Sequence, residues 1–262
     1  MDNRKEYPIL FKPFMQHQIR TGWKSVTRRV ITESNSDCGS YLHSLDFSDA
    51  IKDCFLLGPK TGYLKVAKPD DETRWRVTPK WTDGDRLWVK EKWMRNWDGM
   101  EEGVDLFDED GDPLPEYCTY SEMPEVWDDT HRDDYRWKSP LFMPKAAARL
   151  WLEVVSVRPE RLQELTAADA VLEGVSFDKD SGYWFAEDEI MADTALCCFI
   201  KLWDSINAKP KKVKTNPTNG AKEECYVSYP WSDVQYEDTY RNLTHYVMGN
   251  PWVWRVEFAV SS

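Results

Sequence analysis

Alternating apolar and polar positions predict several short β-strands along this chain. In residues 86–93, Leu87 and Val89 point to one face, whereas Trp88 and Lys90 point to the other. The same reading predicts strands over residues 25–31, 149–157 and 252–260. Several strands with few helices between them favour a small barrel or curled sheet over a parallel α/β fold.

Helical spacing and helix-stop signals predict three helices between these strands. One covers residues 15–21 and stops before Gly22. Another covers residues 167–173, where Thr166 is the N-cap and Asp169 completes a capping box. The third is longer, ends near residue 207 and has its apolar stripe at Leu196, Phe199, Ile200 and Trp203.

Three segments are predicted as insertions, at about residues 32–80, 96–138 and 208–230. Segment 96–138 holds 15 acidic and 3 basic residues, which is typical of an acidic surface loop. Residues 208–222 contain five lysines, and their composition predicts a flexible exposed loop, with a phosphate-binding arm as the alternative.

Composition narrows the functional classes. The formal charge of −12 argues against a protein whose whole surface binds duplex nucleic acid. A small basic pocket for a single nucleotide remains compatible with this charge. The sequence has no apolar run of transmembrane length and no secretory signal at its start, so we expect a cytoplasmic protein that does not enter membranes. Six cysteines without Cys-x-x-Cys spacing and four histidines predict no metal site.

Three features carry candidate chemistry: the polar segment 22–29, Glu91 and Glu173. Glu91 lies on the apolar face of its predicted strand, and a buried carboxylate is costly unless it is paired. We expect its partner to be Arg28 or Arg29. The pair serves either as a structural ion pair or in ligand binding.

Several motifs of this chain together resemble one family. Residues 22–29 read Gly-Trp-Lys-Ser-Val-Thr-Arg-Arg, which resembles the ASCH motif, roughly G-x-K-T-x-T-x-R, with Ser25 in place of the usual threonine. Residues 84–91 resemble the second motif of the family, and residues 170–174 resemble its A-x-x-E-G helix end. The chain is similar to the longer ASCH (PUA-like) proteins of bacteriophages and prophages.

The resemblance implies an α+β fold: a PUA-like small β-barrel flanked by short helices, within one domain over residues 1–262 that carries the long loop insertions. It also implies a phage- or prophage-encoded protein in the cytoplasm of a bacterial host cell.

The resemblance implies two functional classes. One is an amidohydrolase that removes an acyl group from the exocyclic amine of cytidine-type nucleosides such as N(4)-acetylcytidine, without metal or other cofactor. The alternative is a non-catalytic module that binds single-stranded RNA or modified bases. The residues matching the family's catalytic set are Lys24, Thr27 and Glu173, and the expected substrate-binding residues are Ser25, Arg28, Arg29, Glu91 and Trp93.

The enzymatic alternative is chemically coherent. A threonine hydroxyl such as that of Thr27 becomes a nucleophile when a base removes its proton, and a desolvated lysine can act as that base. Strict strand alternation would place Lys24 and Thr27 on opposite faces. The hypothesis therefore requires Lys24 to lie before the strand begins.

Overall fold

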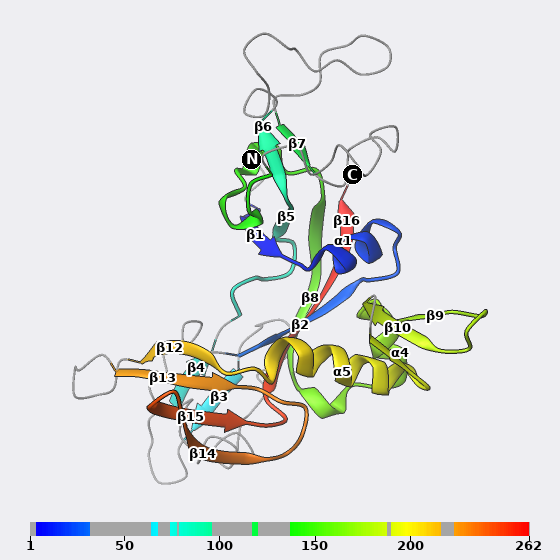
Figure 1. The fold of residues 1–262 in the computed structure, drawn as a ribbon. Helices are drawn as coiled ribbons and strands as arrows, with labels where there is room; N and C mark the ends of the chain where they lie inside the picture. The colour runs from blue at the N-terminus through cyan, green and yellow to red at the C-terminus, as the bar shows by residue number, and fades with distance from the viewer. Residues whose placement is uncertain are drawn as a thin grey trace, which may run out of the picture. The chain divides into compact units, whose positions relative to one another are not determined.

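The structure is a computed structural model that describes residues 4–31, 64–67, 74–77, 79–95, 117–119, 137–187, 190–215 and 223–261 (Figure 1). It is α+β, with many strands and few helices in the described residues. These strands form open sheets, so the predicted PUA-like barrel is not confirmed. Most of the predicted insertions 32–80 and 96–138 lies outside the described residues.

The chain divides into two compact units. Unit 1 comprises Met1–Arg20, Gly84–Glu153 and Ala259–Ser262, and unit 2 comprises Thr21–Asp83 and Val154–Phe258. The expectation of a single domain with insertions stays a prediction.

Unit 1 contains one edge of the five-stranded sheet, and the alternating sequence pattern predicted one of its strands. Strand β5 (Arg86–Lys90) pairs in parallel with β1 (Glu6–Leu10) and antiparallel with the first residues of β8 (Trp151–Arg161). Leu87 and Val89 are fully buried on the face predicted for them, and Trp88 on the opposite face is buried too, so both faces of β5 are covered. The predicted strand is interrupted, however: β5 ends at Lys90, and a second strand begins at Trp93.

The remaining elements of unit 1 are short. They are α1 (Pro13–Arg20), β6 (Trp93–Arg95), β7 (Tyr117–Thr119) and the 3₁₀ turns η3 (Pro140–Phe142) and η4 (Lys145–Ala147). The two strands β6 and β7 pair antiparallel. One core cluster contains Trp88, Trp93, Met143, Ala147 and Ala148.

Unit 2 contains the strand that begins in the ASCH-like motif. Strand β2 (Val26–Val30) pairs antiparallel with β16 (Trp252–Ser261), and β16 neighbours β8. The register places Thr27 opposite Val256 and Arg28 opposite Arg255. The predicted strands 25–31 and 252–260 are therefore confirmed to within a residue or so.

The helices of unit 2 follow the local signals. Helix α4 (Ala167–Leu172) starts with the predicted capping box of Thr166 and Asp169, and Gly174 follows with a positive φ of 99°. Helix α5 (Ala195–Asn207) lies against α4 (Figure 1). Its buried face is shifted from the predicted stripe and comprises Ala195, Cys198, Phe199, Leu202 and Trp203.

Unit 2 also holds several smaller pieces. These are β3 (Leu64–Ala67) paired with β4 (Arg74–Val77), η5 (Leu162–Glu164), and a sheet of β9 (Ser176–Phe177), β10 (Trp184–Glu187) and β11 (Ile190–Ala192) in the order β11-β10-β9. Strands β3 and β4 fall in segment 32–80, where the sequence predicted only an insertion.

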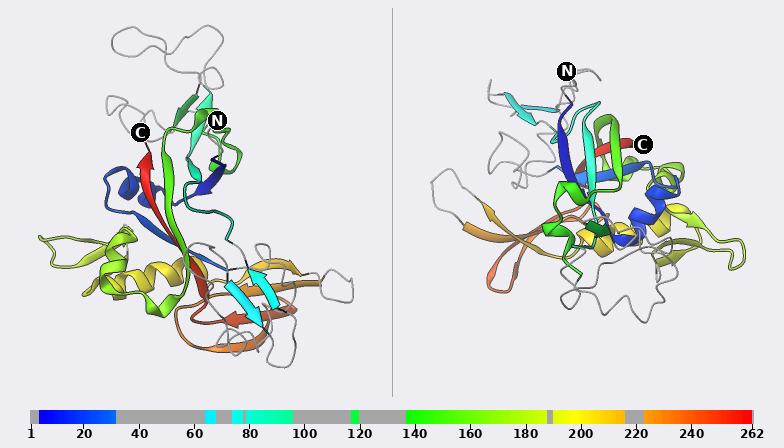
Figure 2. Two further views of the ribbon diagram at one scale, coloured as in Figure 1. Left: turned by 180° about the vertical axis from the view of Figure 1, so that it is seen from behind. Right: turned by 90° about the horizontal axis from the view of Figure 1, so that it is seen from above.

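The predicted loop over residues 208–222 is wrong in its first half. Strand β12 (Lys211–Thr215) pairs antiparallel with β13 (Glu223–Ser228), as Figure 2 shows. With β14 (Gln235–Tyr240) and β15 (Leu243–Met248) they form a sheet in the order β12-β13-β15-β14. Lysines suit an edge strand because they discourage pairing with another chain, and Lys212 also lies 2.7 Å from Glu224 across the ladder.

Candidate functional site

The backbone places Lys24 outside the strand, as the enzymatic hypothesis requires. Strand β2 begins at Val26, and Lys24 forms an isolated antiparallel bridge with Glu173, just after α4. The N–H of Ser25 donates to the carbonyl of Leu172 at 3.0 Å. These bonds hold the end of α4 against the segment that enters β2, so the two motif residues meet although 149 positions separate them.

The Lys24 ammonium is fully buried and has three acceptors. Its Nζ donates to Glu173 Oε2 at 2.6 Å, to the Glu173 carbonyl at 2.8 Å and to the Val26 carbonyl at 2.8 Å. The side chain is 0% exposed. Burial lowers the pKa of Lys24; the Glu173 carboxylate opposes this effect, and the nearby charges of Arg29 and Arg28 add to it.

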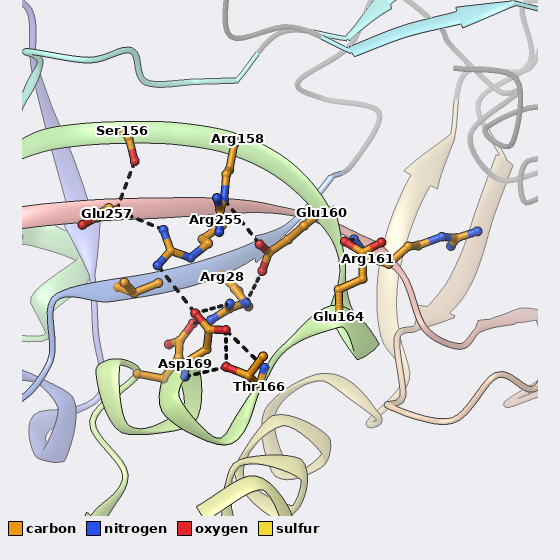
Figure 3. Close-up of polar contacts among 12 residues, drawn as sticks. Arg28, Ser156, Arg158, Glu160, Arg161, Glu164, Thr166, Asp169, Arg255 and Glu257 are labelled. Atoms are coloured by element: carbon orange, nitrogen blue, oxygen red, sulfur yellow. Dashed lines mark hydrogen bonds and ion pairs between the residues drawn. The ribbon is translucent and has the colours of Figure 1, made fainter. Parts of the chain in front are cut away.

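The second oxygen of Glu173 binds a second buried cation. Arg28 Nη1 donates to Glu173 Oε1 at 3.1 Å, and Arg28 Nε donates to Glu160 Oε1 at 2.6 Å. Figure 3 shows Glu160 and Asp169 pointing toward Arg28, whose Nη2 lies 3.4 Å from Asp169 Oδ1. Burial opposes the charge, but the carboxylates of Glu173 and Glu160 outweigh it and raise the pKa of Arg28.

The network continues along β16. Arg255 Nη2 lies 3.6 Å from Asp169 Oδ1, and Arg255 Nη1 donates to Glu257 Oε2 at 3.0 Å (Figure 3). Partial burial of Asp169 is outweighed by its hydrogen bonds from Thr166 and by the charges of Arg28 and Arg255, which lower the pKa of Asp169. The sequence assigned Asp169 only a capping role, so its place in this ion network was missed.

Thr27 lies near these residues in sequence but does not join them. It is 4% exposed, and among the described residues none forms a hydrogen bond with its hydroxyl. Alternation along β2 places Thr27 and Arg29 on the face opposite Arg28. Burial also lowers the pKa of Arg29. The structure thus joins Lys24 to Glu173 but leaves the Thr27 hydroxyl unengaged.

Two predicted site residues belong to unit 1. Glu91 is buried, and its Oε2 lies 2.7 Å from Arg20 Nη2. The expected partner was Arg28 or Arg29; the structure instead shows Arg20 paired with Glu91, and the Arg28 guanidinium pairs with carboxylates of unit 2. Trp93 belongs to the core cluster of unit 1 and packs beside Tyr117.

Comparison with known proteins adds no family: no family model, no curated protein and no solved structure matches this chain. Across the residues that the structure describes, no group of three or more His, Cys, Asp or Glu side chains could hold a metal ion. Within the same residues, no helix has the length and apolar character needed to span a membrane.

Proposed function

We propose that this protein is an amidohydrolase that removes an acyl group from the exocyclic amine of a cytidine-type nucleoside such as N(4)-acetylcytidine. The proposal rests on one observation: the buried Lys24 ammonium lies 2.6 Å from the Glu173 carboxylate, and burial lowers its pKa. A buried lysine–carboxylate pair of this kind can take up and return a proton during catalysis. Its two members are also the lysine and the glutamate of the ASCH-like motifs.

The reaction divides into two balanced steps. The Lys24 ammonium first passes a proton to the Glu173 carboxylate; neutral Lys24 then removes the proton of the Thr27 hydroxyl, whose oxygen attacks the acyl carbon and forms a tetrahedral oxyanion. Glu173 then delivers a proton to the leaving amine, which releases cytidine and leaves an ester on Thr27. A water molecule hydrolyses this ester, releases the carboxylic acid and restores the hydroxyl.

This mechanism requires substrate binding to change one distance in the site, that between Thr27 and Lys24. The unengaged Thr27 hydroxyl must come within hydrogen-bond reach of Lys24, whose three N–H groups bind Glu173 and Val26 in the structure. Catalytic hydrogen bonds are often long or absent before substrate binds. Arg29, which shares the face of Thr27 on β2, is the nearest cation in sequence that could stabilise the oxyanion.

Lys24→Met should reduce the conversion of N(4)-acetylcytidine to cytidine by about 10²–10⁴-fold, because it removes the base but keeps an unbranched side chain. Thr27→Val, which keeps the shape of the side chain, should reduce turnover to a similar extent. Chromatography of the products measures both effects, and circular dichroism verifies that each variant is folded. Lys179→Met is the matched control, because Lys179 is an exposed lysine of the same unit.

Undiminished turnover in folded Lys24→Met and Thr27→Val proteins would exclude this mechanism. A folded wild-type protein without any turnover of acylated cytidines would exclude the proposed function itself.

One observation favours the alternative of a module that binds RNA. Trp23, directly before Lys24, is 56% exposed, and an exposed indole can stack on an unpaired base. Under this alternative, Trp23→Ala should weaken binding to a single-stranded RNA by about 1–3 kcal/mol per stacked base. Fluorescence titration at low and high salt tests this; no binding at low salt contradicts the alternative.

A further inference from the structure

A second group of chemically active side chains lies on the sheet β12-β13-β15-β14. Ser228 Oγ lies 3.0 Å from His245 Nε2, and His245 Nδ1 lies 2.8 Å from Asp238 Oδ1. Serine, histidine and a carboxylate in this order form the constellation that activates a serine nucleophile. It is recognised by geometry and not by sequence position.

The strand register brings the three side chains to one face of the sheet. Asp238 on β14 is the direct partner of His245 on β15, and Tyr226 on β13 is the direct partner of the same histidine. Ser228 lies two residues beyond Tyr226, so the two share a face. Each residue comes from a different strand, and the ladder hydrogen bonds fix their spacing.

The hydrogen bonds define the direction of proton transfer. An ionised Asp238 carboxylate can only accept, so His245 Nδ1 carries the proton that it donates to Asp238. In the neutral imidazole, Nε2 is then without a proton and accepts from the Ser228 hydroxyl. This is the tautomer in which a histidine can remove the serine proton.

The surroundings distinguish the nucleophile from an ordinary surface serine. Ser228 is 2% exposed and His245 is also buried, whereas the Asp238 side chain is 46% exposed. Two tyrosine rings lie next to the histidine: the Tyr240 centroid is 6.0 Å from the His245 ring and 4.9 Å from the Tyr226 ring. The hydroxyl thus lies away from bulk water, and the histidine that binds it lies beside an aromatic ring.

We propose that Ser228, His245 and Asp238 form a second reactive site, which accepts the acyl group of a small ester with an aromatic substituent. Ser228 Oγ attacks the ester carbonyl while His245 Nε2 takes its proton. His245 then gives this proton to the leaving alkoxide, and a water molecule hydrolyses the acyl-serine to a carboxylic acid. Asp238 is a positioning residue that acts through His245, and Tyr226 and Tyr240 offer the surface for the aromatic substituent.

A small fluorophosphonate probes this site directly, because Ser228 Oγ would form a bond to phosphorus, fluoride would leave and His245 would take the proton. Peptide mass spectrometry of the full-length protein should find the adduct on Ser228. His245→Gln should slow labelling by about 10²–10⁴-fold, since the base is lost. Asp238→Asn should also slow labelling, and the labelling rate of this variant should vary less with pH than that of the wild type. Because the Asp238 side chain is half-exposed, the substitution should have little effect on folding.

Ser232→Ala is the matched control, because Ser232 is an exposed serine of the same unit, and it should be labelled on Ser228 at the wild-type rate. The Lys24→Met protein should be labelled equally, which separates this site from the amidohydrolase proposal. A folded wild-type protein without an adduct on Ser228, or with labelling indifferent to both His245→Gln and Asp238→Asn, would overturn the inference and make the three residues a purely structural link between strands.

Discussion

Replacing Glu173 with glutamine should lower the free energy of unfolding at neutral pH by about 3–5 kcal/mol, the cost typical of removing one partner of a buried ion pair. The two carboxylate oxygens each bind a different buried cation, Lys24 at 2.6 Å and Arg28 at 3.1 Å. A glutamine amide has one acceptor oxygen and one donor nitrogen, so it faces one of these cations with N–H groups. Chemical denaturation followed by tryptophan fluorescence measures the loss.

The loss of unfolding free energy in Glu173→Gln, relative to the wild type, should become smaller as the pH rises. In the wild type, Glu173 opposes the effect of burial on the Lys24 ammonium. Without the carboxylate, the pKa of Lys24 in the folded state falls further below the value of 10.5 that applies to the unfolded chain. The unfolded state then binds more protons than the folded state, so stability increases with pH between these two values, and denaturation at about pH 6 and about pH 9 should show it.

Glu257→Gln provides the matched comparison, because this glutamate pairs with Arg255 at 3.0 Å while its side chain is 43% exposed. Exposed pairs contribute about 0–1 kcal/mol. A Glu173→Gln protein as stable as the Glu257→Gln protein, with no pH dependence of the difference, would show that the buried pairing does not stabilise the fold.

Local signals were sufficient to predict the ends of α4. The N-cap Thr166, its partner Asp169 and the following glycine lie within a few residues of one another, and each acts through backbone conformation or a short-range hydrogen bond. Strand alternation likewise placed Leu87 and Val89 of β5 on one buried face, but it did not reveal that Trp88, on the opposite face, is buried as well. The meeting of Lys24 with Glu173 was suggested by the family resemblance alone, because no local pattern connects residues so far apart.

Long-range pairing explains what the sequence did not reveal. Glu160 and Arg255 hold inward positions on β8 and β16, but only the strand register shows that they face Arg28 and Asp169. The lysines of β12 suggested a loop because their composition is that of exposed chain, whereas ladder hydrogen bonds to β13 make the segment a strand. The Ser228, His245 and Asp238 group has the same origin, because three separate strands bring it together.

Replacing Arg28 with methionine should destabilise the fold by about 3–5 kcal/mol at neutral pH, again because it removes one side of a buried ionic cluster. The guanidinium lies within 3.4 Å of three carboxylates, those of Glu160, Asp169 and Glu173. Methionine fills much of the same volume but leaves these like charges facing one another with less compensation. The free energy of unfolding from urea denaturation measures the effect.

The pH dependence should have the opposite sign from that of Glu173→Gln. Arg28 is one of the groups that lower the pKa of Asp169 below 3.8 in the folded state. Stability from such a depressed carboxylate is present above its unfolded pKa and is lost as the pH falls through its folded pKa. The variant has less of this stability to lose, so its deficit relative to the wild type should shrink as the pH falls below about 4 toward about 2.

Arg158→Met is the control for this second substitution, because Arg158 approaches the same Glu160 at 3.6 Å while its side chain is 61% exposed. We expect a loss of at most about 1 kcal/mol from it. Equal losses of unfolding free energy in Arg28→Met and Arg158→Met would contradict the prediction that buried Arg28 stabilises the fold more than exposed Arg158. The opposite pH trends of Glu173→Gln and Arg28→Met are the sharper criterion, because a cavity or a general packing defect at this position would lower stability in both variants without giving the two deficits opposite slopes.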